Sequence, residues 1–450
     1  MDTSTPAVVL KFDPNVMHHG GLGVIRSLGR IGVPVYGVHE DPLAPAAGSR
    51  YLQGRFFWRP SPDDVDRVLD GLTRLAAIIG RQAVLITTDD AGALFLAEHG
   101  GALRERFLFP DPPPDLPRRL AGKYSLHEIC DELGVASPRT ALPGSRAEAR
   151  DFAQAAGYPV IAKLTAPWNA SKGLRSTQVV ADEDELGRVY ENCAHADAGL
   201  MLQEFIPGGQ GHDWFFHGYC DAAADCRPAF TGVKERSYPV GAGLTSRGRA
   251  TANDALRGEV TSLLARLGYR GLLDLDIRLD DRDGRYHLLD FNPRLGAQFR
   301  LFRDTAGTDV ALAAYLDLTG QPIPEATQVD GRCFVVENYD PISALAQWRA
   351  GELGLRPWLA SLRTADEWAW FARDDLRPFG LMCVRMGWRS VTRRFTGHRV
   401  HSARDGFRYR PGRLAAHGGN SAPATAGRAA PRLDSASPCP QTQTQTTAQP

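Results

Sequence analysis

The 450-residue sequence lacks the features that mark several classes of protein. No stretch approaches the roughly 18 consecutive apolar residues of a membrane-spanning helix, and the N-terminus has no charged segment followed by a long apolar run. The seven cysteines are scattered and include no Cys-x-x-Cys pair, which disfavours a disulfide framework and a zinc site. Lysine plus arginine balance aspartate plus glutamate at 52 each, so charge does not indicate a nucleic-acid partner. We therefore expect a cytoplasmic protein with no nucleic-acid partner and no stable membrane insertion.

Several catalytic motifs are also missing. The sequence contains no Gly-x-x-x-x-Gly-Lys-Ser/Thr loop and no Gly-x-Ser-x-Gly nucleophile turn. The run Gly20-Gly21-Leu22-Gly23 is a poor match to the Gly-x-Gly-x-x-Gly dinucleotide fingerprint. A P-loop nucleotidase, a serine hydrolase and a nicotinamide-dependent enzyme are therefore disfavoured.

The most informative segment that is present is an acidic β-hairpin. One arm, Leu272–Leu279, alternates strictly between apolar residues and polar residues that include Asp276. The other arm, Tyr286–Asn292, places Asp290 and Asn292 on one face, because side chains two residues apart in a strand point the same way. The register of the two arms then decides whether the acids meet.

Two turns are compatible with this sequence. A two-residue turn at Asp283-Gly284 would place Asp276 and Asp290 on opposite faces of the ribbon, whereas a three-residue loop, Arg282–Gly284, would set them directly opposite each other. In the second case Gly284 takes the left-handed position that such loops favour. We expect the second register, since in the first a carboxylate would be buried without a partner.

Two carboxylates and an amide oxygen on one face are hard oxygen ligands, which suit Mg²⁺. Asp276, Asp290 and Asn292 are therefore the candidate metal ligands, with Mn²⁺ as the alternative ion. Arg294 follows two residues later and would reach toward anionic charge at the same place. The other acids of the hairpin are expected to be solvated surface residues: Asp280, Asp281 and Asp283.

The segment that ends in Asp-Phe-Asn-Pro-Arg resembles the ATP-grasp superfamily of nucleotide-dependent ligases, in which an acid, an acid, an Asn and often an Arg follow in this order. Within that superfamily it is similar to the predicted carboxylate–amine ligases that include D-aspartate ligase. The resemblance covers roughly residues 7–320. These relatives usually carry Glu at the positions of Asp276 and Asp290, and the shorter Asp puts bridging of two metal ions in doubt.

The resemblance implies an α/β architecture in which an α+β ATP-grasp domain follows a Rossmann-like one. The strand–glycine turn–helix–strand pattern at residues 7–38 is typical of a parallel α/β unit, in agreement with this. The Ser-, Thr- and Gln-rich C-terminus cannot bury enough apolar surface to fold. The expected organisation is a Rossmann-like pre-ATP-grasp domain over residues 1–115, a two-lobed ATP-grasp domain over 116–320, a small C-terminal helical addition over 321–410 and a disordered tail over 411–450.

Two lysines are candidate phosphate ligands. Lys163 lies in the middle of an apolar strand, where an ammonium group is unexpected unless it meets a buried anion. Lys123 lies near the start of a helix that precedes this strand in the sequence. In the resembling family the matching lysines hold the α- and β-phosphates of ATP. A small-residue loop that covers the γ-phosphate there matches residues 165–173, including Ser171, Lys172 and Gly173.

The remaining nucleotide contacts come from the resemblance. The strand that ends at Pro207 is similar to the hinge that reads the adenine edge, which assigns Gln203, Glu204, Phe205 and Ile206 to the base. A later acid, Asp213, is assigned to the ribose. Arg236 is either an anion contact beside the triphosphate or part of a structural ion pair with Glu235 or another neighbour.

The N-terminal domain contributes to the acceptor site in the resembling family. Asp13, His18 and His19 would line that site, or would be ordinary turn residues. The run Thr87–Asp90 follows a predicted buried strand. At the carboxyl end of a parallel strand such residues either contact a ligand or cap the next helix.

The resemblance implies an ATP- and Mg²⁺-dependent ligase. It would phosphorylate a small-molecule carboxylate and join the acyl group to an amine, with amino acids as candidate substrates. The alternatives are a carboxylase or kinase on the same fold, and a nucleotide-binding regulatory protein without turnover. Sequence leaves both substrates unidentified and the oligomeric state open, with a homodimer as one option.

Overall fold

The computed structural model describes residues 1–165, 177–196, 198–209, 211–238, 243–392 and 407–412. The predicted disordered tail and the predicted phosphate-covering residues Ser171, Lys172 and Gly173 lie outside these ranges, apart from the first two residues assigned to the tail. Within the ranges no helix combines the length and apolar character needed to cross a bilayer.

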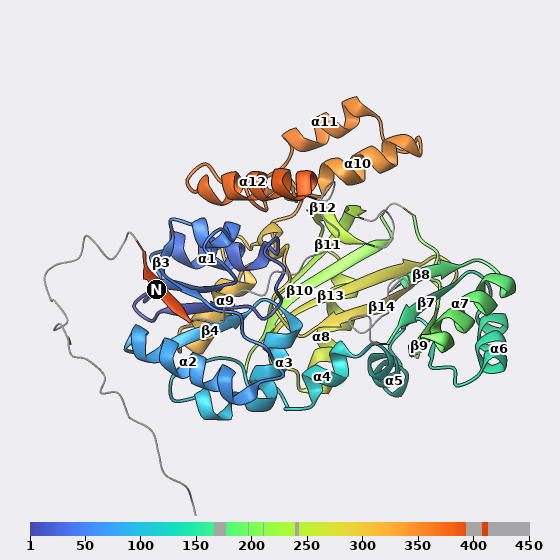
Figure 1. The fold of residues 1–450 in the computed structure, drawn as a ribbon, viewed down its shortest axis with the longest axis horizontal. Helices are drawn as coiled ribbons and strands as arrows, with labels where there is room; N and C mark the ends of the chain where they lie inside the picture. Colours follow the sequence, from blue (N-terminus) through green and yellow to red (C-terminus); the bar gives the residue numbers. More distant parts are fainter. Residues whose placement is uncertain (166–176, 197, 210, 239–242, 393–406, 413–450) are drawn as a thin grey trace, which may run out of the picture. The chain divides into compact units, whose positions relative to one another are not determined.

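The N-terminal segment forms a parallel sheet with helices packed against it, as the sequence predicted (Figure 1). The strand order is β17-β3-β2-β1-β4-β5, and the edge strand β17 comes from the distant C-terminal part of the chain and runs antiparallel to β3. The strands are β1 (Ala7–Leu10), β2 (Val35–His39), β3 (Leu52–Phe57), β4 (Ala83–Thr87), β5 (Phe107–Leu108) and β17 (Arg408–Pro411), and the helices are α1 (Gly20–Arg30), α2 (Val65–Ile79) and α3 (Asp90–His99).

A small antiparallel sheet with the order β6-β9-β7-β8 forms the next lobe. In β7 the apolar side chains of Val160, Ala162 and Leu164 pack with two helices, so alternation sends Lys163 to the opposite face. The elements of this lobe are β6 (Thr140–Ala141), α6 (Arg146–Ala156), β7 (Val160–Leu164), β8 (Thr177–Val180), α7 (Glu183–His195) and β9 (Leu200–Glu204).

The largest sheet has the order β14-β13-β10-β11-β12-β15-β16. Helices α4, α5 and α8 share a core with Leu273, Leu275 and Ile277 of β13, which leaves Asp274 and Asp276 on the opposite face. The elements are α4 (Leu116–Ala121), α5 (Lys123–Leu133), β10 (Asp213–Cys220), β11 (Cys226–Tyr238), β12 (Leu244–Ala250), α8 (Asp254–Leu267), β13 (Gly271–Asp280), β14 (Arg285–Asn292), β15 (Cys333–Val335) and β16 (Glu367–Trp368).

The C-terminal addition is helical, as predicted, but it also completes both large sheets. Its helices α10 (Asp340–Arg349), α11 (Leu355–Arg363) and α12 (Arg377–Thr392) follow α9 (Val310–Leu318). Strands β15 and β16 from this part extend the largest sheet, and β17 extends the N-terminal sheet. The α/β fold class is confirmed, while the residue boundaries of the domains stay predictions.

Helix α2 begins after Asp64, whose side chain accepts a hydrogen bond from the Arg67 N–H. One local detail differs from the sequence-based expectation. The segment expected to form one helix around Lys123 forms two, because Gly122 is extended and caps α5, whose first residue is Lys123.

The hairpin brings Asp276 opposite Asp290, and Asp274 opposite Asn292, as the sequence predicted. The reason differs from the expected one. The loop between the paired residues Asp280 and Arg285 has four residues, and one extra residue in β14, between the partners of Asp276 and Ile277, restores the alignment. Gly284 has the expected positive φ of 70°.

Candidate active site

Three acidic side chains of the hairpin each contact a cation. Lys123 Nζ lies 2.8 Å from Asp290 Oδ2, and Lys234 Nζ lies 2.7 Å from Asp276 Oδ1. Arg294 Nη1 donates to Asp274 Oδ2 at 2.7 Å. The structure therefore brings Lys123, Asp276, Asp290 and Arg294 into one cluster, as predicted, and adds Lys234 and Asp274, which the sequence did not single out.

Lys163 faces the same cluster from the small lobe. Its ammonium donates a hydrogen bond of 2.6 Å to Gln203 Oε1. Burial, together with the charge of Lys123, lowers the pKa of Lys163 to about 8, against the opposite effect of Asp290. No carboxylate in the described part of the chain lies within ion-pair distance of this ammonium. A half-buried cation without an anionic partner is suited to binding an anion.

Lys234 and Arg236, the second of which was the predicted anion contact, lie on the same strand, β11, and the structure separates them. An irregularity in the pairing of β11 with β12 between these residues breaks the alternation that would have put both on one face. Burial alone would lower the pKa of Lys234, but Asp276 raises it above its usual value. A bulge is not visible in a residue pattern, which is why sequence reasoning chose Arg236.

Arg236 forms a buried ion pair with Asp340 at the start of α10. Its Nε and Nη2 atoms lie 2.7 and 3.1 Å from the two carboxylate oxygens, and Trp358 Nε1 donates to the same carboxylate at 2.9 Å. The structural ion pair is therefore the interpretation that the geometry favours, with Asp340 rather than Glu235 as partner. We do not include Arg236 among the anion contacts.

The predicted adenine-edge residues lie at the end of β9. Gln203 is buried and also donates to Thr140 Oγ1 at 3.2 Å, whereas the Glu204 carboxylate accepts from Arg139 Nε at 3.1 Å and Arg282 Nη2 at 2.9 Å. Arg282 also binds Asp280, so the expectation that Asp280 is a solvated surface acid is wrong: it is 1% exposed.

Arg278 connects two further predicted nucleotide residues. Its Nη1 donates to the Ile206 carbonyl at 3.1 Å, and its Nε donates to the Asp213 carboxylate at 2.7 Å. Asp213 and Arg278 are opposite each other in the β10–β13 register. The assignment of Asp213 to the ribose stays a prediction, as does that of Phe205.

The N-terminal sheet faces Arg294 with its carboxyl edge. Asp89 accepts hydrogen bonds from the N–H groups of Phe12, Asp13 and Gly92, so it caps α3 and holds the loop after β1. Asp90, the next residue, has its Oδ1 3.3 Å from Arg294 Nε. In the run Thr87–Asp90, Asp89 therefore caps α3, and Asp90 reaches the candidate site.

His18 belongs to the same edge. Burial, together with the neighbouring His19, Lys11 and Arg294 side chains, holds the pKa of His18 well below its usual value. Burial also lowers the pKa of His19 to about 4. Both imidazoles are therefore neutral at neutral pH.

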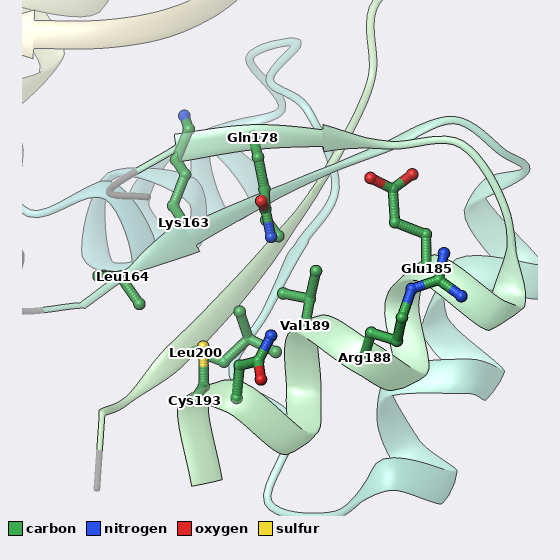
Figure 2. Close-up of a pocket in the computed structure, with 10 residues that line it drawn as sticks. Lys163, Leu164, Gln178, Glu185, Arg188, Val189, Cys193 and Leu200 are labelled. Atoms are coloured by element: carbon green, nitrogen blue, oxygen red, sulfur yellow. The ribbon is translucent and has the colours of Figure 1, made fainter. Parts of the chain in front are cut away.

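A cavity of about 230 Å³ lies between the small sheet and α7 (Figure 2). Val189 and Cys193 of α7 line it, while the side chain of Lys163 extends from the strand away from that helix. This cavity therefore lies on the helix-packed side of the lobe and not on the side of the charged cluster.

The acidic face fits a divalent cation. The Asp276 and Asp290 side chains are 31% and 30% exposed, so each keeps an accessible oxygen beside its lysine. Asn292 Nδ2 donates to the Asp274 carbonyl at 3.1 Å, which leaves the amide oxygen as a ligand. A second cluster of possible metal ligands consists of Asp280, Asp283 and His287. Ion pairs account for its arrangement without a metal, because Asp280 pairs with Arg282 and Asp283 lies 2.9 Å from His287.

Comparison with known proteins gives relatives at low identity. No family model matches the chain. A D-aspartate ligase of Enterococcus faecium (strain Aus0004) is 25% identical over 277 residues, which cover 57% of this chain and 64% of that protein. A urea amidolyase of Lachancea kluyveri is 24% identical over 313 residues, which cover 64% of this chain and 16% of that protein. The chain thus spans less than two thirds of the length of either relative.

Solved structures give the same architecture. N5-carboxyaminoimidazole synthetase from Staphylococcus aureus superposes with a TM-score of 0.53 at 10% identity, covering 73% of this chain and 81% of that one. The biotin carboxylase domain of Hydrogenobacter thermophilus 2-oxoglutarate carboxylase, solved with MgADP, ADP and bicarbonate, gives 0.51 at 18% identity, covering 72% of each chain. At these identities the likeness shows the fold.

Proposed function

We propose that this chain, whose fold is that of the ATP-grasp superfamily, is an ATP-dependent ligase that phosphorylates a carboxylate and joins the acyl group to an amine, releasing ADP and phosphate. The similarity to a D-aspartate ligase supports this chemistry. The observation that carries the proposal is the position of Lys163, a half-buried cation without a carboxylate partner among the described residues, opposite the acidic hairpin. That arrangement is suited to holding a triphosphate between the lysines and the hairpin.

The nucleotide is held by this chain's own groups. Lys123 and Lys163 bind its phosphates, and the segment Gln203–Ile206 lies against the base, with Asp213 toward the ribose. Asp276, Asp290 and Asn292 would hold Mg²⁺, which neutralises charge on the phosphates. Because Lys123 Nζ lies 2.8 Å from Asp290 in the described structure, the lysine must turn from this carboxylate to the phosphate as the nucleotide binds.

The chemistry then needs no covalent nucleophile from the protein. A carboxylate oxygen of the substrate attacks the γ-phosphate, and the Arg294 guanidinium stabilises the negative charge that develops there. The amine next attacks the acyl carbon and phosphate leaves. Arg294 is fixed for this role by Asp274, whose carboxylate lies 2.7 Å from Nη1.

A screen for ADP and phosphate release over amino acids and small carboxylic acids tests the proposal. The expected products are ADP and phosphate in equal amounts, and hydroxylamine should intercept the acyl phosphate as a hydroxamate. Oxygen-18 placed in the carboxylate should appear in the phosphate. AMP as the stoichiometric product would refute the mechanism.

The carboxylase alternative is tested in the same screen, because solved structures with this fold include a carboxylase domain with bound bicarbonate. ADP release that requires bicarbonate and no other carboxylate would favour a carboxylase. Tight ATP binding without any turnover would favour a regulatory nucleotide-binding protein.

A further inference from the structure

The loops at the carboxyl edge of the N-terminal sheet meet the segment that follows β14. An added Cβ at Gly20 would lie 3.2 Å from the Ala297 backbone, so the two chain segments are in close contact there. Asp89 fixes the loop after β1 by accepting from two of its N–H groups. Asp90 is thereby held beside Arg294 by a rigid part of the fold.

Most charges around the reaction centre form close pairs. Lys123 is paired with Asp290 and Lys234 with Asp276, while Arg294 makes its shorter contact, 2.7 Å, with Asp274 and a longer one, 3.3 Å, with Asp90. Lys163, on the nucleotide side, has no carboxylate partner among the described residues and matches an anionic ligand. Asp90, on the N-terminal side, shares Arg294 with Asp274 and its side chain is 46% exposed, so its carboxylate is accessible to a cationic ligand.

Several buried polar atoms of this edge and of β10 lack hydrogen-bond partners within the described ranges. Thr88 Oγ1, in a fully buried residue, and His18 Nδ1 have none, and Asp90 Oδ1 has only its 3.3 Å ion pair with Arg294. His217 is also fully buried, and its Nε2 lies 3.2 Å from Asp274 Oδ1 while its Nδ1 lacks a partner. Unpaired buried polar atoms are rare in folded proteins, and a bound polar ligand is one explanation for them.

We propose that Asp90 binds the ammonium group of the amine substrate and takes its proton, so that the amine is a cationic primary amine. This inference rests on the proposed ligase function. The ammonium transfers one proton to the Asp90 carboxylate, and the nitrogen lone pair then forms the C–N bond. The C–O bond to phosphate breaks, phosphate leaves with the electron pair, and the second nitrogen proton departs with it. Burial raises the pKa of Asp90, against the effect of Arg294, which makes it a better proton acceptor.

A comparison of hydroxylamine with a cationic amine as the acceptor distinguishes a role of Asp90 in amine deprotonation from a structural role. Hydroxylamine is neutral near neutral pH and needs no deprotonation before it attacks, so it bypasses Asp90. In Asp90→Asn, hydroxamate formation should fall by less than about threefold, while amide formation with the best amine from a panel of L- and D-amino acids falls at least about 100-fold. The amine KM should rise, and Asp90→Glu should recover part of the rate.

Asp66→Asn is the matched control. Asp66, like Asp90, is an acidic residue in the first turn of a helix of the N-terminal domain, in this case α2. It should change neither reaction. Equal loss of hydroxamate and amide in Asp90→Asn, or loss of neither, would refute the assignment of Asp90 while leaving the ligase function intact. A wild-type protein that makes no hydroxamate with any carboxylate would refute the ligase function, and this inference with it.

Discussion

At the scale of single residues, the site is a set of ionisable groups whose charges depend on burial. Lys163 shows this, since its pKa of about 8 is below the value of a free lysine. The lysine is charged at neutral pH and loses its proton as the pH rises through about 8. ATP binding should therefore weaken as the pH rises through that range, because the protonated form is the one that binds phosphate.

The Lys163→Arg variant tests this dependence. Arginine stays charged throughout, so its ATP affinity should be flat where that of the wild type falls by about tenfold per pH unit above pH 8. Isothermal titration at several pH values measures both. Parallel curves for the two proteins would show that another group is responsible.

Asp290→Asn tests the metal assignment. The substitution keeps size and removes a charge from the cluster, and Lys123 loses its ion-pair partner. Turnover of ATP should fall at least about 100-fold, and the affinity for Mn²⁺ in the presence of nucleotide should fall with it. An unchanged melting temperature would show that the loss is local, and wild-type turnover would contradict the assignment.

Glu337 gives a pH dependence of stability. Burial raises its pKa to about 7, above the value of 4.5 for an unperturbed Glu, although backbone N–H groups of Phe371 and Trp370 favour the charged form. The folded state therefore holds this proton more tightly than the unfolded state, and its contribution to stability is full at low pH and lost as the pH rises from about 4.5 to 7. Across that range the wild type should lose about 3 kcal/mol of unfolding free energy relative to Glu337→Gln, which does not titrate, as measured by urea unfolding.

At the scale of elements, β17 is a strand whose pairing the sequence did not predict. It pairs with β3, and the rings of Phe407 and Tyr409 contact Phe56 at centroid distances of 5.7 and 5.0 Å. Truncation after residue 406 should reduce the free energy of unfolding by about 2–3 kcal/mol, from lost apolar burial. Truncation after residue 412 should leave it unchanged, because the removed residues are too polar to form a core. Equal stability of the two truncations would show that β17 contributes nothing.

At the scale of the whole molecule, the C-terminal addition is attached to the N-terminal domain by a buried ion pair. Arg26 of α1 and Asp375 are each 1% exposed at the side chain, 3.1 Å apart, and the Asp375 carboxylate also accepts from Ser49 Oγ and the Arg50 N–H. Asp375→Asn leaves the Arg26 charge buried without a counter-ion. We expect a loss of about 3–5 kcal/mol in unfolding free energy.

The neighbouring acid is the control for this prediction. Asp374 pairs with Arg30 at the surface, where both side chains are about a third exposed or more. Asp374→Asn should cost at most about 1 kcal/mol. Similar values for the two variants, measured by chemical unfolding, would show that burial does not set the strength of the Arg26 contact.

The sequence by itself determined what depends on neighbours along the chain. Strict alternation predicted the hairpin and the alignment of Asp276 with Asp290, and a charged residue in an apolar strand marked Lys163. These signals are local, because alternation in a strand and the preference of a turn are encoded within a few residues. The strand–helix–strand order of the N-terminal domain followed from the same kind of pattern.

Only the tertiary structure decided what depends on distant partners. Arg236 and Asp340 are 104 positions apart, and the β11 irregularity that separates Arg236 from Lys234 has no residue signature. Asp280 is buried because Arg282 folds over it and also reaches Glu204, 78 positions away. Asp90 meets Arg294 although the two residues are far apart in the sequence, because the end of β4 and the segment after β14 lie side by side. The charge state of such groups is set by the three-dimensional approach of segments, and a linear pattern does not contain that approach.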